Sequence, residues 1–160
     1  MTPKDFDELE KIIKYKFKNK ELLKNALTHK TFAFEAKEPI EYNERLEFLG
    51  DSILGCIVAE ELYKANKYFS EGELTRRRSV LVNNTFLAKR ARELGIGKYL
   101  FLGKGEKIQG GAENSTNIAN AMEALIGAVY LDSNLKTVRK FIINTLYEGN
   151  KVAWILFFKF

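Results

Sequence analysis

The sequence is short of the residues that build zinc sites, disulfides and proline-rich linkers: its 160 residues include one cysteine, one histidine and two prolines. A single cysteine excludes an intrachain disulfide and fits a reducing compartment such as the cytoplasm. We expect Cys56 to be a small buried hydrophobe, because its neighbours in the sequence are aliphatic. His29 has no histidine or cysteine partner, so we interpret it as a hydrogen-bonded structural residue rather than a metal ligand or a base.

Long apolar runs are also missing, and no stretch approaches the roughly 18 residues of a membrane span. The N-terminus is charged and polar, so we expect no signal peptide, and neither a repeat nor a low-complexity tract divides the chain. Hydrophobic residues make up 46% and charged residues 29%, as in one globular domain. The formal net charge of +5 favours a polyanionic partner without identifying one.

Apolar residues recur at helical spacing along most of the chain, which predicts an all-α fold. We expect helices over 5–17, 21–31, 43–65, from Ser70 past Leu81, over 86–94, from 116 through 131, and over 133–148. Ser70 and Glu73 have the spacing of a capping box at the start of the fourth helix. Residues 33–42 and the glycine-rich residues 103–111 are expected to be loops.

Three carboxylates mark the helix over 43–65: Glu44, Glu47 and Asp51. Their spacing of three and four residues places them on one face, on successive turns. Apolar residues fill the other faces and share the acids' face, so this helix is expected to be largely buried. Buried like charges need cations or protons to neutralise them. A solvated acidic face is one interpretation; a site for a hard divalent cation with oxygen ligands, Mg²⁺ or Mn²⁺, is the one we favour.

A second nearly all-apolar helix begins at Thr116 and is also expected to be central. Its polar residues include Asn120 and Glu123, which are three residues apart and therefore share a face. Neither polar cluster is a complete site alone. Two buried helices packed against each other would bring them together.

Three segments resemble the motifs of one family. Residues 44–52 read ERLEFLGDS, residues 119–132 read ANAMEALIGAVYLD, and residues 28–31 read THKT after the second expected helix. They resemble the ribonuclease III family, the endonucleases that cleave double-stranded RNA. The resemblance implies an all-α endonuclease domain of roughly seven to nine helices over residues 1–150.

An apolar tail over 151–160 follows that domain. It is too short to span a membrane, and we expect it to pack on this domain or on a second chain. Full-length bacterial members of the family continue into a double-stranded-RNA-binding domain. The tail is therefore also interpreted as the start of a linker to such a domain.

The resemblance also implies roles for individual acids. Four residues match the family's metal positions: Glu47, Asp51, Asn120 and Glu123. Of these, Asp51 and Glu123 are the expected catalytic residues. Glu44 and Glu71 match auxiliary acidic positions of the family. Capping of the next helix is an adequate structural reason for an acid at Glu71. The implied cofactor is Mg²⁺, for which Mn²⁺ would substitute. Metal-activated water would attack phosphorus and leave 5′-phosphate and 3′-hydroxyl ends.

Asn120 departs from the family pattern, which has an aspartate at this place most often. An amide oxygen still ligates a hard ion, but it brings no charge. The change should weaken metal binding and slow hydrolysis. Three explanations remain open: a natural active variant, an engineered inactivating change, or a protein that binds RNA without cutting it.

The implied partners are double-stranded RNA and a second copy of the chain, each copy cutting one strand to leave a short 3′ overhang. Recognition is expected through A-form shape and 2′-hydroxyls. Candidates for phosphate contacts, each with a solvated helix face or loop as the alternative, are Arg76, Arg77, Arg78, Lys104 and Lys107. Phe48 lies between two acids and is a candidate for insertion into the partner; packing within its own core is equally open.

We therefore expect an endoribonuclease of double-stranded RNA that acts in RNA processing. A non-catalytic RNA-binding or ribosome-associated member of the same fold is the first alternative. A helical protein that uses a metal for a different hydrolysis is the second.

Overall fold

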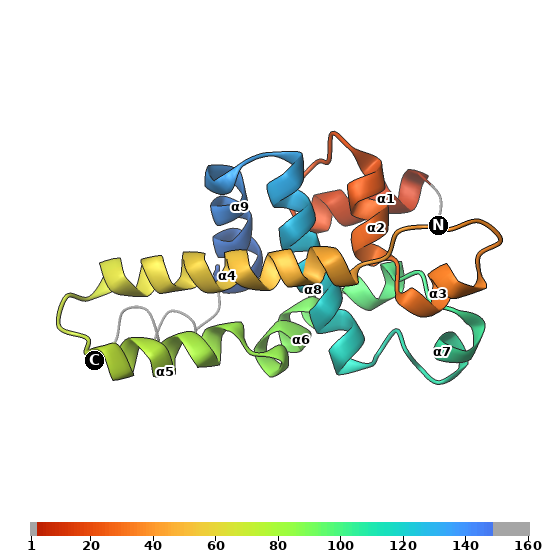
Figure 1. The fold of residues 1–160 in the computed structure, drawn as a ribbon. Coiled ribbons are helices and arrows are strands. Elements are labelled where there is room, and N and C mark those ends of the chain that lie inside the picture. The colour runs from red at the N-terminus through yellow and green to blue at the C-terminus, as the bar shows by residue number, and fades with distance from the viewer. Residues whose placement is uncertain (1–2, 149–160) are drawn as a thin grey trace.

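The computed structural model describes residues 3–148 and, within them, an all-α fold (Figure 1). The helices are α1 (Pro3–Ile12), α2 (Lys20–Leu27), α3 (Lys30–Glu35), α4 (Glu44–Ala65), α5 (Glu71–Val82), α6 (Asn84–Glu93), α7 (Lys104–Ile108), α8 (Ser115–Asp132) and α9 (Leu135–Ile142). A 3-10 helix, η1 (Ile96–Tyr99), and a π-helix, η2 (Ile143–Tyr147), complete them. In this part of the chain no helix is long and apolar enough to cross a membrane. The predicted all-α class is confirmed, whereas the tail over 151–160 lies outside the described residues.

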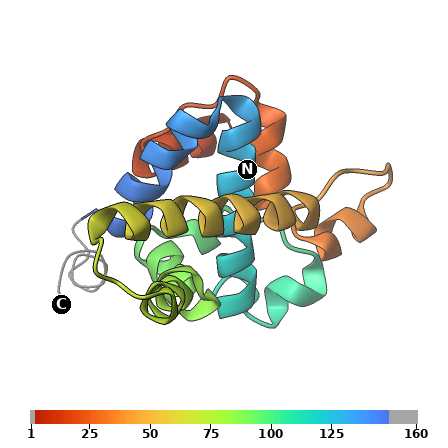
Figure 2. The same cartoon turned by 60° about the vertical axis from the view of Figure 1, so that its left-hand side comes forward.

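Two long helices cross at the centre of the molecule. In Figures 1 and 2, α4 runs across the front of the molecule and α8 passes behind it at a steep angle, and these two helices share the most extensive contact of any pair. A Cβ atom on Gly50 would lie 1.8 Å from the carbonyl oxygen of Glu123, and one on Gly127 would lie 2.3 Å from the carbonyl oxygen of Leu46. Glycine therefore lets the two backbones touch where they cross.

α8 is the most buried helix, as its sequence predicts. Every residue from 117 to 129 except Asn120 is buried, because α2, α4, α6 and α9 surround the helix. The Asn114 side chain caps its first turn by accepting from the N–H groups of Thr116 and Asn117. At its other end the Asp132 carboxylate accepts from the Tyr15 hydroxyl at 2.7 Å and from two backbone N–H groups of the α1–α2 loop. The last buried turns of α8 are thus tied to the N-terminal part of the chain.

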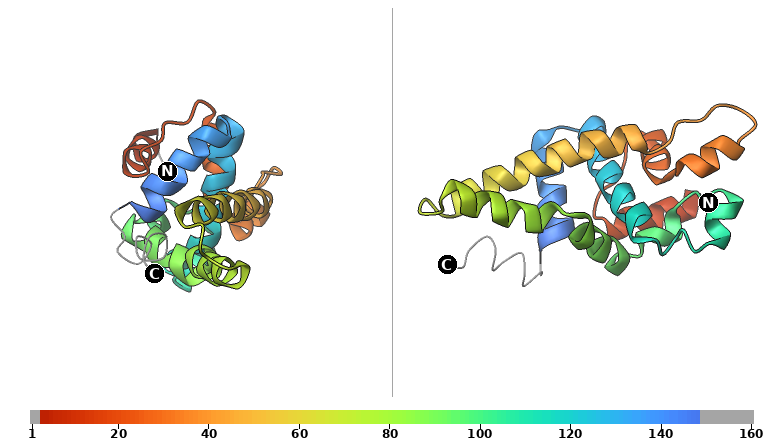
Figure 3. Two further views of the ribbon diagram at one scale, coloured as in Figure 1. Left: turned by 90° about the vertical axis from the view of Figure 1, so that its left-hand side faces the viewer. Right: turned by 60° about the horizontal axis from the view of Figure 1, so that its bottom comes forward.

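α4 and α5 form an antiparallel hairpin that extends away from the crossing (Figure 3). The Ser70 half of the predicted capping box is confirmed, because the Ser70 hydroxyl accepts from the backbone N–H of Glu73 at 3.3 Å, whereas the Glu73 carboxylate pairs with Arg77. α5 buries only two side chains, those of Arg77 and Leu81. This half of the hairpin is therefore held by few contacts.

Several boundaries differ from the prediction. α1 ends at Ile12 because Lys14 adopts a positive φ of 54°, so the apolar residues that follow reach the core from a loop. The helix predicted over 21–31 ends at Leu27, and α3 covers the end of that prediction and the start of the predicted loop over 33–42. α7 is a short helix within the predicted loop over 103–111, and the last helix changes to π geometry at Ile143. The prediction for Cys56 is wrong: its thiol is exposed, since its position on α4 faces away from α8 while its aliphatic neighbours face inward.

Candidate functional site

The start of α4 is fixed by a buried polar residue. The backbone N–H of Asn43 donates to the carbonyl oxygen of Thr28 at 2.9 Å, and its own carbonyl accepts from the N–H of Glu47 at 2.8 Å. From this start the three acids of α4 follow along one face, as their spacing predicts. Glu44 and Asp51 are exposed and Glu47 is half-buried, so the acid-bearing face lies at the rim of the core rather than wholly inside it.

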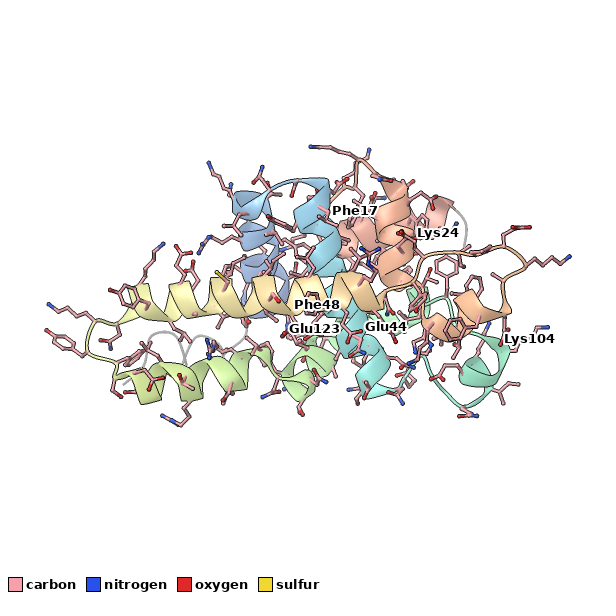
Figure 4. The ribbon with its side chains drawn as sticks, viewed as in Figure 1. Phe17, Lys24, Glu44, Phe48, Lys104 and Glu123 are labelled. Atoms are coloured by element: carbon pink, nitrogen blue, oxygen red, sulfur yellow. The ribbon has the colours of Figure 1, made fainter. Side chains whose placement is uncertain are left out.

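Glu123 on α8 is the buried acid of the site. Only 6% of it is exposed, and its backbone lies against Gly50 at the crossing of the two helices. Burial raises the pKa of its carboxyl to about 7, and the negative charges of Asp51 and Glu47 add to this shift. Figure 4 shows Glu123 and Glu44 along the same lower edge of α4. The fold therefore brings acids from the two central helices into one electrostatic cluster.

Glu47 connects the two helices. Burial raises the pKa of its carboxyl, the charge of Glu44 raises it further, and the side-chain amide of Asn120 acts in the opposite direction. The Oε2 atom of Glu47 is buried and has no hydrogen-bond partner in the described part of the chain. A buried acceptor without a donor is costly, which makes this oxygen the strongest sign that the site takes a positively charged ligand.

A divalent cation fits this set of donors by its chemistry. Among residues 3–148 no three Asp, Glu, His or Cys side chains stand close enough to hold one ion. The site offers a buried carboxylate oxygen without a partner, a carboxyl with a pKa of about 7 and an amide one helical turn away, and all three are oxygen donors.

Glu44 lies at the start of α4, whereas Glu71 follows the end of α4. Glu44 lies in the first turn and forms an ion pair with Lys30 at 3.1 Å. Glu71 begins α5, beyond the far end of α4, and accepts from the Thr75 hydroxyl at 2.9 Å. Ala65 lies 14 residues after Asp51, a separation of about 20 Å along the helix. Glu71 therefore lies far along the hairpin from the acids of its own chain, and its auxiliary role stays a prediction.

The arginine triplet is split between surface and interior. Arg77 is only 5% exposed; its guanidinium donates to Glu73 at 2.7 Å and lies 3.9 Å from the centre of the Phe69 ring. Its predicted role in phosphate binding is wrong, because it holds the α4–α5 turn instead. Arg76 and Arg78 are exposed and keep that prediction.

Lys104 and Lys107 lie on the short helix α7, which hydrogen bonds anchor at its start and its middle. The backbone N–H of Lys104 donates to Glu35 at 2.9 Å, and that of Gly103 donates to the Thr31 hydroxyl at 3.1 Å. In the middle of α7, Glu106 accepts from the amide of Asn117, a buried residue at the start of α8, at 2.7 Å. Both lysines are exposed, and Figure 4 shows Lys104 at the end of the molecule beyond Glu44.

His29 has a structural role, as predicted, but it is also close to the acids. Its Nδ1 atom lies 2.8 Å from the Thr31 hydroxyl and accepts from the Thr31 N–H at the start of α3. Burial lowers the pKa of its imidazole, while the charges of Glu106 and Glu44 raise it. Sequence spacing alone could not place His29 beside Glu106.

Phe48 points outward from α4, and 78% of it is exposed (Figure 4). The alternative that it packs within its own core is wrong. Beside it lies a groove of about 1,010 Å³, whose apolar lining includes Leu22, Ile40, Tyr42, Leu46, Leu49 and Leu131. An exposed aromatic ring next to an apolar groove is typical of a protein interface.

Comparison with known proteins shows which family this chain is similar to. The Ribonuclease-III-like family model matches residues 19–149. Proteins named Ribonuclease 3 from Caldanaerobacter subterraneus subsp. tengcongensis and Clostridium kluyveri are 47% and 45% identical over 88% and 89% of this chain, which correspond to 61% and 58% of their own lengths. The chain thus spans about three fifths of these relatives. A solved nuclease domain of ribonuclease III from Campylobacter jejuni, described for flexibility in a region involved in dimer formation, is 36% identical with a TM-score of 0.82, covering 89% of this chain and 96% of that one.

Proposed function

This chain belongs to the ribonuclease III family, and we propose that it is a divalent-metal-dependent endoribonuclease that cleaves double-stranded RNA. The observation that carries the proposal is the acid cluster at the crossing of α4 and α8. There the buried Glu123 shares its electrostatic surroundings with Glu47 and Asp51, and Glu47 has an oxygen without a partner. Such a cluster destabilises the fold unless a cation or protons compensate it. A catalytic metal site explains why the chain keeps it.

Glu47, Asp51, Asn120 and Glu123 would hold the metal, with Mg²⁺ as the expected ion and Mn²⁺ as a substitute. A bound divalent ion supplies a water of lowered pKa and stabilises charge that develops on phosphate oxygens. Glu123 and Asp51 are the proposed catalytic residues because they lie at the crossing itself. Glu47 anchors the site from its half-buried position, and Glu44 extends the acidic edge toward the RNA. The proposed products carry 5′-phosphate and 3′-hydroxyl ends.

The positive charges lie away from the acids and suit the RNA backbone. Arg76 and Arg78 are exposed on α5, which runs alongside the C-terminal half of α4, and Lys104 and Lys107 are exposed on α7, beyond the N-terminal end of α4 (Figure 1). A duplex laid along α4 would meet positive charge at both ends and the acids between them. A-form shape and 2′-hydroxyls would then select RNA.

A homodimer would give one site for each strand of the duplex, and the short 3′ overhang would follow from the offset between the sites. Phe48 and the groove of about 1,010 Å³ beside it supply an exposed ring and an apolar recess on the same face of α4. In a symmetric pair each ring would enter the partner's groove. The proposed setting is RNA processing in the cytoplasm.

The alternative is a non-catalytic RNA-binding member of the family, which Asn120 favours. The amide cannot supply the charge of an aspartate, so metal affinity and rate should both fall. Against this alternative, the acids Glu44, Glu47, Asp51 and Glu123 are all present. A site that had lost its activity long ago would be expected to lose several of them.

Incubation of a long RNA duplex with the wild-type chain and with Asn120→Asp, in Mg²⁺ and in Mn²⁺, tests the proposal. We expect cleavage by the wild type and faster cleavage by the variant. Asp51→Asn within each background is the matched control and should abolish cleavage. Duplex binding without cleavage by either protein would favour the non-catalytic alternative. Failure to bind duplex RNA at low salt would favour a different hydrolysis.

A further inference from the structure

His29 carries a hydrogen-bond donor that the fold itself does not use. Its Nδ1 atom accepts from the backbone N–H of Thr31 and lies 2.8 Å from the Thr31 hydroxyl. In a neutral imidazole this places the proton on Nε2. No described residue accepts a hydrogen bond from Nε2, and the side chain is half-buried rather than enclosed.

Two backbone hydrogen bonds fix the position of His29. Its backbone N–H donates to the carbonyl oxygen of Phe101 at 3.0 Å, and the preceding residue, Thr28, accepts from the N–H of Asn43 at 2.9 Å. Asn43 precedes the acid-bearing helix α4, and Phe101 leads to the lysines of α7. His29 therefore lies at a junction between the acids and the basic α7, and backbone hydrogen bonds of Thr28 and His29 join this segment to both.

The charges around the ring favour a neutral ligand. Glu44 and Glu106 are both close enough to act on the imidazole, and Lys30 balances only part of their charge through its ion pair with Glu44 at 3.1 Å. Two carboxylates would repel a phosphate group. A hydroxyl group carries no charge, accepts a hydrogen bond from an N–H and donates one to a carboxylate. The chemistry of this position thus matches a sugar hydroxyl.

We infer that His29 is a specificity-determining residue whose Nε2–H donates to a 2′-hydroxyl of the bound RNA duplex. The inference rests on the proposed function, since it takes duplex RNA as the substrate. It adds a contact that reads the sugar, which distinguishes RNA from DNA at this point of the backbone. Because the donor is neutral, the contact should depend little on salt, unlike the lysine contacts to phosphate.

Two substitutions separate this role from the structural one. His29→Asn keeps an acceptor near the position of Nδ1, and asparagine is a favoured N-cap, so the start of α3 should be retained while the outer donor is lost. His29→Gln can place an amide N–H near the position of Nε2 but removes the short cap. If only the cap mattered, Asn would behave as the wild type and Gln would not.

The test measures the dissociation constant of an RNA duplex without divalent metal for the wild type, His29→Asn and His29→Gln, with thermal unfolding of each protein. A set of duplexes, each with one 2′-deoxy nucleotide, is measured in parallel. For the wild type we expect one position at which deoxy substitution weakens binding about fivefold, the effect of a single neutral hydrogen bond. His29→Asn should bind the unmodified duplex weaker by the same factor, lose sensitivity at that position and unfold near the wild-type temperature. His29→Gln should keep the sensitivity.

Equal deoxy sensitivity in the wild type and His29→Asn, or no sensitive position at all, would overturn the inference and leave the proposed function intact. If the wild type binds a DNA duplex of the same sequence as tightly as RNA, the proposed function fails and the inference fails with it. If His29→Asn does not fold, His29→Gln decides alone: loss of the sensitive position in that variant overturns the inference.

Discussion

Gly50 is the position at which the α4–α8 crossing can be perturbed most directly. A Cβ atom there would lie 1.8 Å from the carbonyl oxygen of Glu123 and 2.6 Å from its carbonyl carbon, whereas ordinary van der Waals contact begins at 3.4 Å. The obstacle is backbone, so no side-chain rotation relieves it. Gly50→Ala must therefore push α4 and α8 apart or prevent the fold.

The size of the effect follows from this geometry. Overpacking in a tight core costs roughly 1–3 kcal/mol where side chains can adjust, and a backbone clash of this depth should cost at least about 3 kcal/mol. For a domain of this size that corresponds to a fall in Tm on the order of 6–12 °C. Gly55, on the same helix, has no atom within 4 Å of its Cβ position. Gly55→Ala should instead stabilise the chain by about 0.5–1 kcal/mol, because alanine is the better helix former.

Thermal unfolding followed by circular dichroism checks this pair of variants, and a titration with Mn²⁺ checks the site. Gly50→Ala should melt well below the wild type or fail to fold, and any folded fraction should bind Mn²⁺ weakly. Gly55→Ala should melt slightly above the wild type with unchanged Mn²⁺ binding. A Gly50→Ala protein that melts within a degree or two of the wild type would refute the close backbone contact from which the site geometry is argued.

Three further predictions follow from individual contacts. Arg77→Ala removes a buried guanidinium that pairs with Glu73 and packs on Phe69, so it should lower the free energy of unfolding in urea by about 2 kcal/mol. Arg76→Ala should leave the stability unchanged and weaken RNA binding at low salt. Equal effects of the two changes on stability would contradict the structure. Phe48→Asp should shift the chain from dimer to monomer in analytical ultracentrifugation, while the equally exposed Tyr63→Asp should not; a wild-type chain that is already monomeric would count against the proposed interface. The pKa of Glu123 is raised from 4.5 to about 7, so the folded state binds this proton more tightly than the unfolded state. Without divalent metal, the contribution of Glu123 to stability should be full below about pH 4.5 and decline as pH rises to about 7, and Glu123→Gln should remove this part of the slope. Parallel stability profiles for the wild type and Glu123→Gln would show that the carboxyl is not perturbed.

The sequence was most informative where one pattern continued over many turns. α4 and α8 are long, apolar on most faces and marked by acids at helical spacing, and both the helices and the proximity of their acids could be predicted. The acids were expected on a buried face, yet Asp51 is exposed. A helix that crosses another at a steep angle buries only the turns near the contact. The crossing angle depends on how the two helices pack together, so it could not be predicted from the sequence of either helix.

Features set by tertiary contacts could not be predicted. In the sequence Arg77 appeared equivalent to Arg76 and Arg78. Only the α4–α5 turn places the Phe69 ring against its guanidinium, and this contact is why Arg77 alone points inward. Glu71 matched a family position but begins a helix that the hairpin carries away from the acids of its own chain. His29 was rightly taken as hydrogen-bonded, while its closeness to Glu44 and Glu106 arises from the junction of three segments distant in the sequence.

The central claim is that carboxylates from α4 and α8 act on one shared cation, and a calorimetric titration of the full chain with Mn²⁺ tests it most directly. The wild type, Asp51→Asn, Glu123→Gln and the double variant would be compared at one pH above the pKa of Glu123. We predict that each single change lowers the affinity for Mn²⁺ at least tenfold, and that the double change costs much less than the sum of the two, as expected when both groups serve one ion. Wild-type Mn²⁺ affinity in either single variant, or two independent and additive losses, would contradict the account.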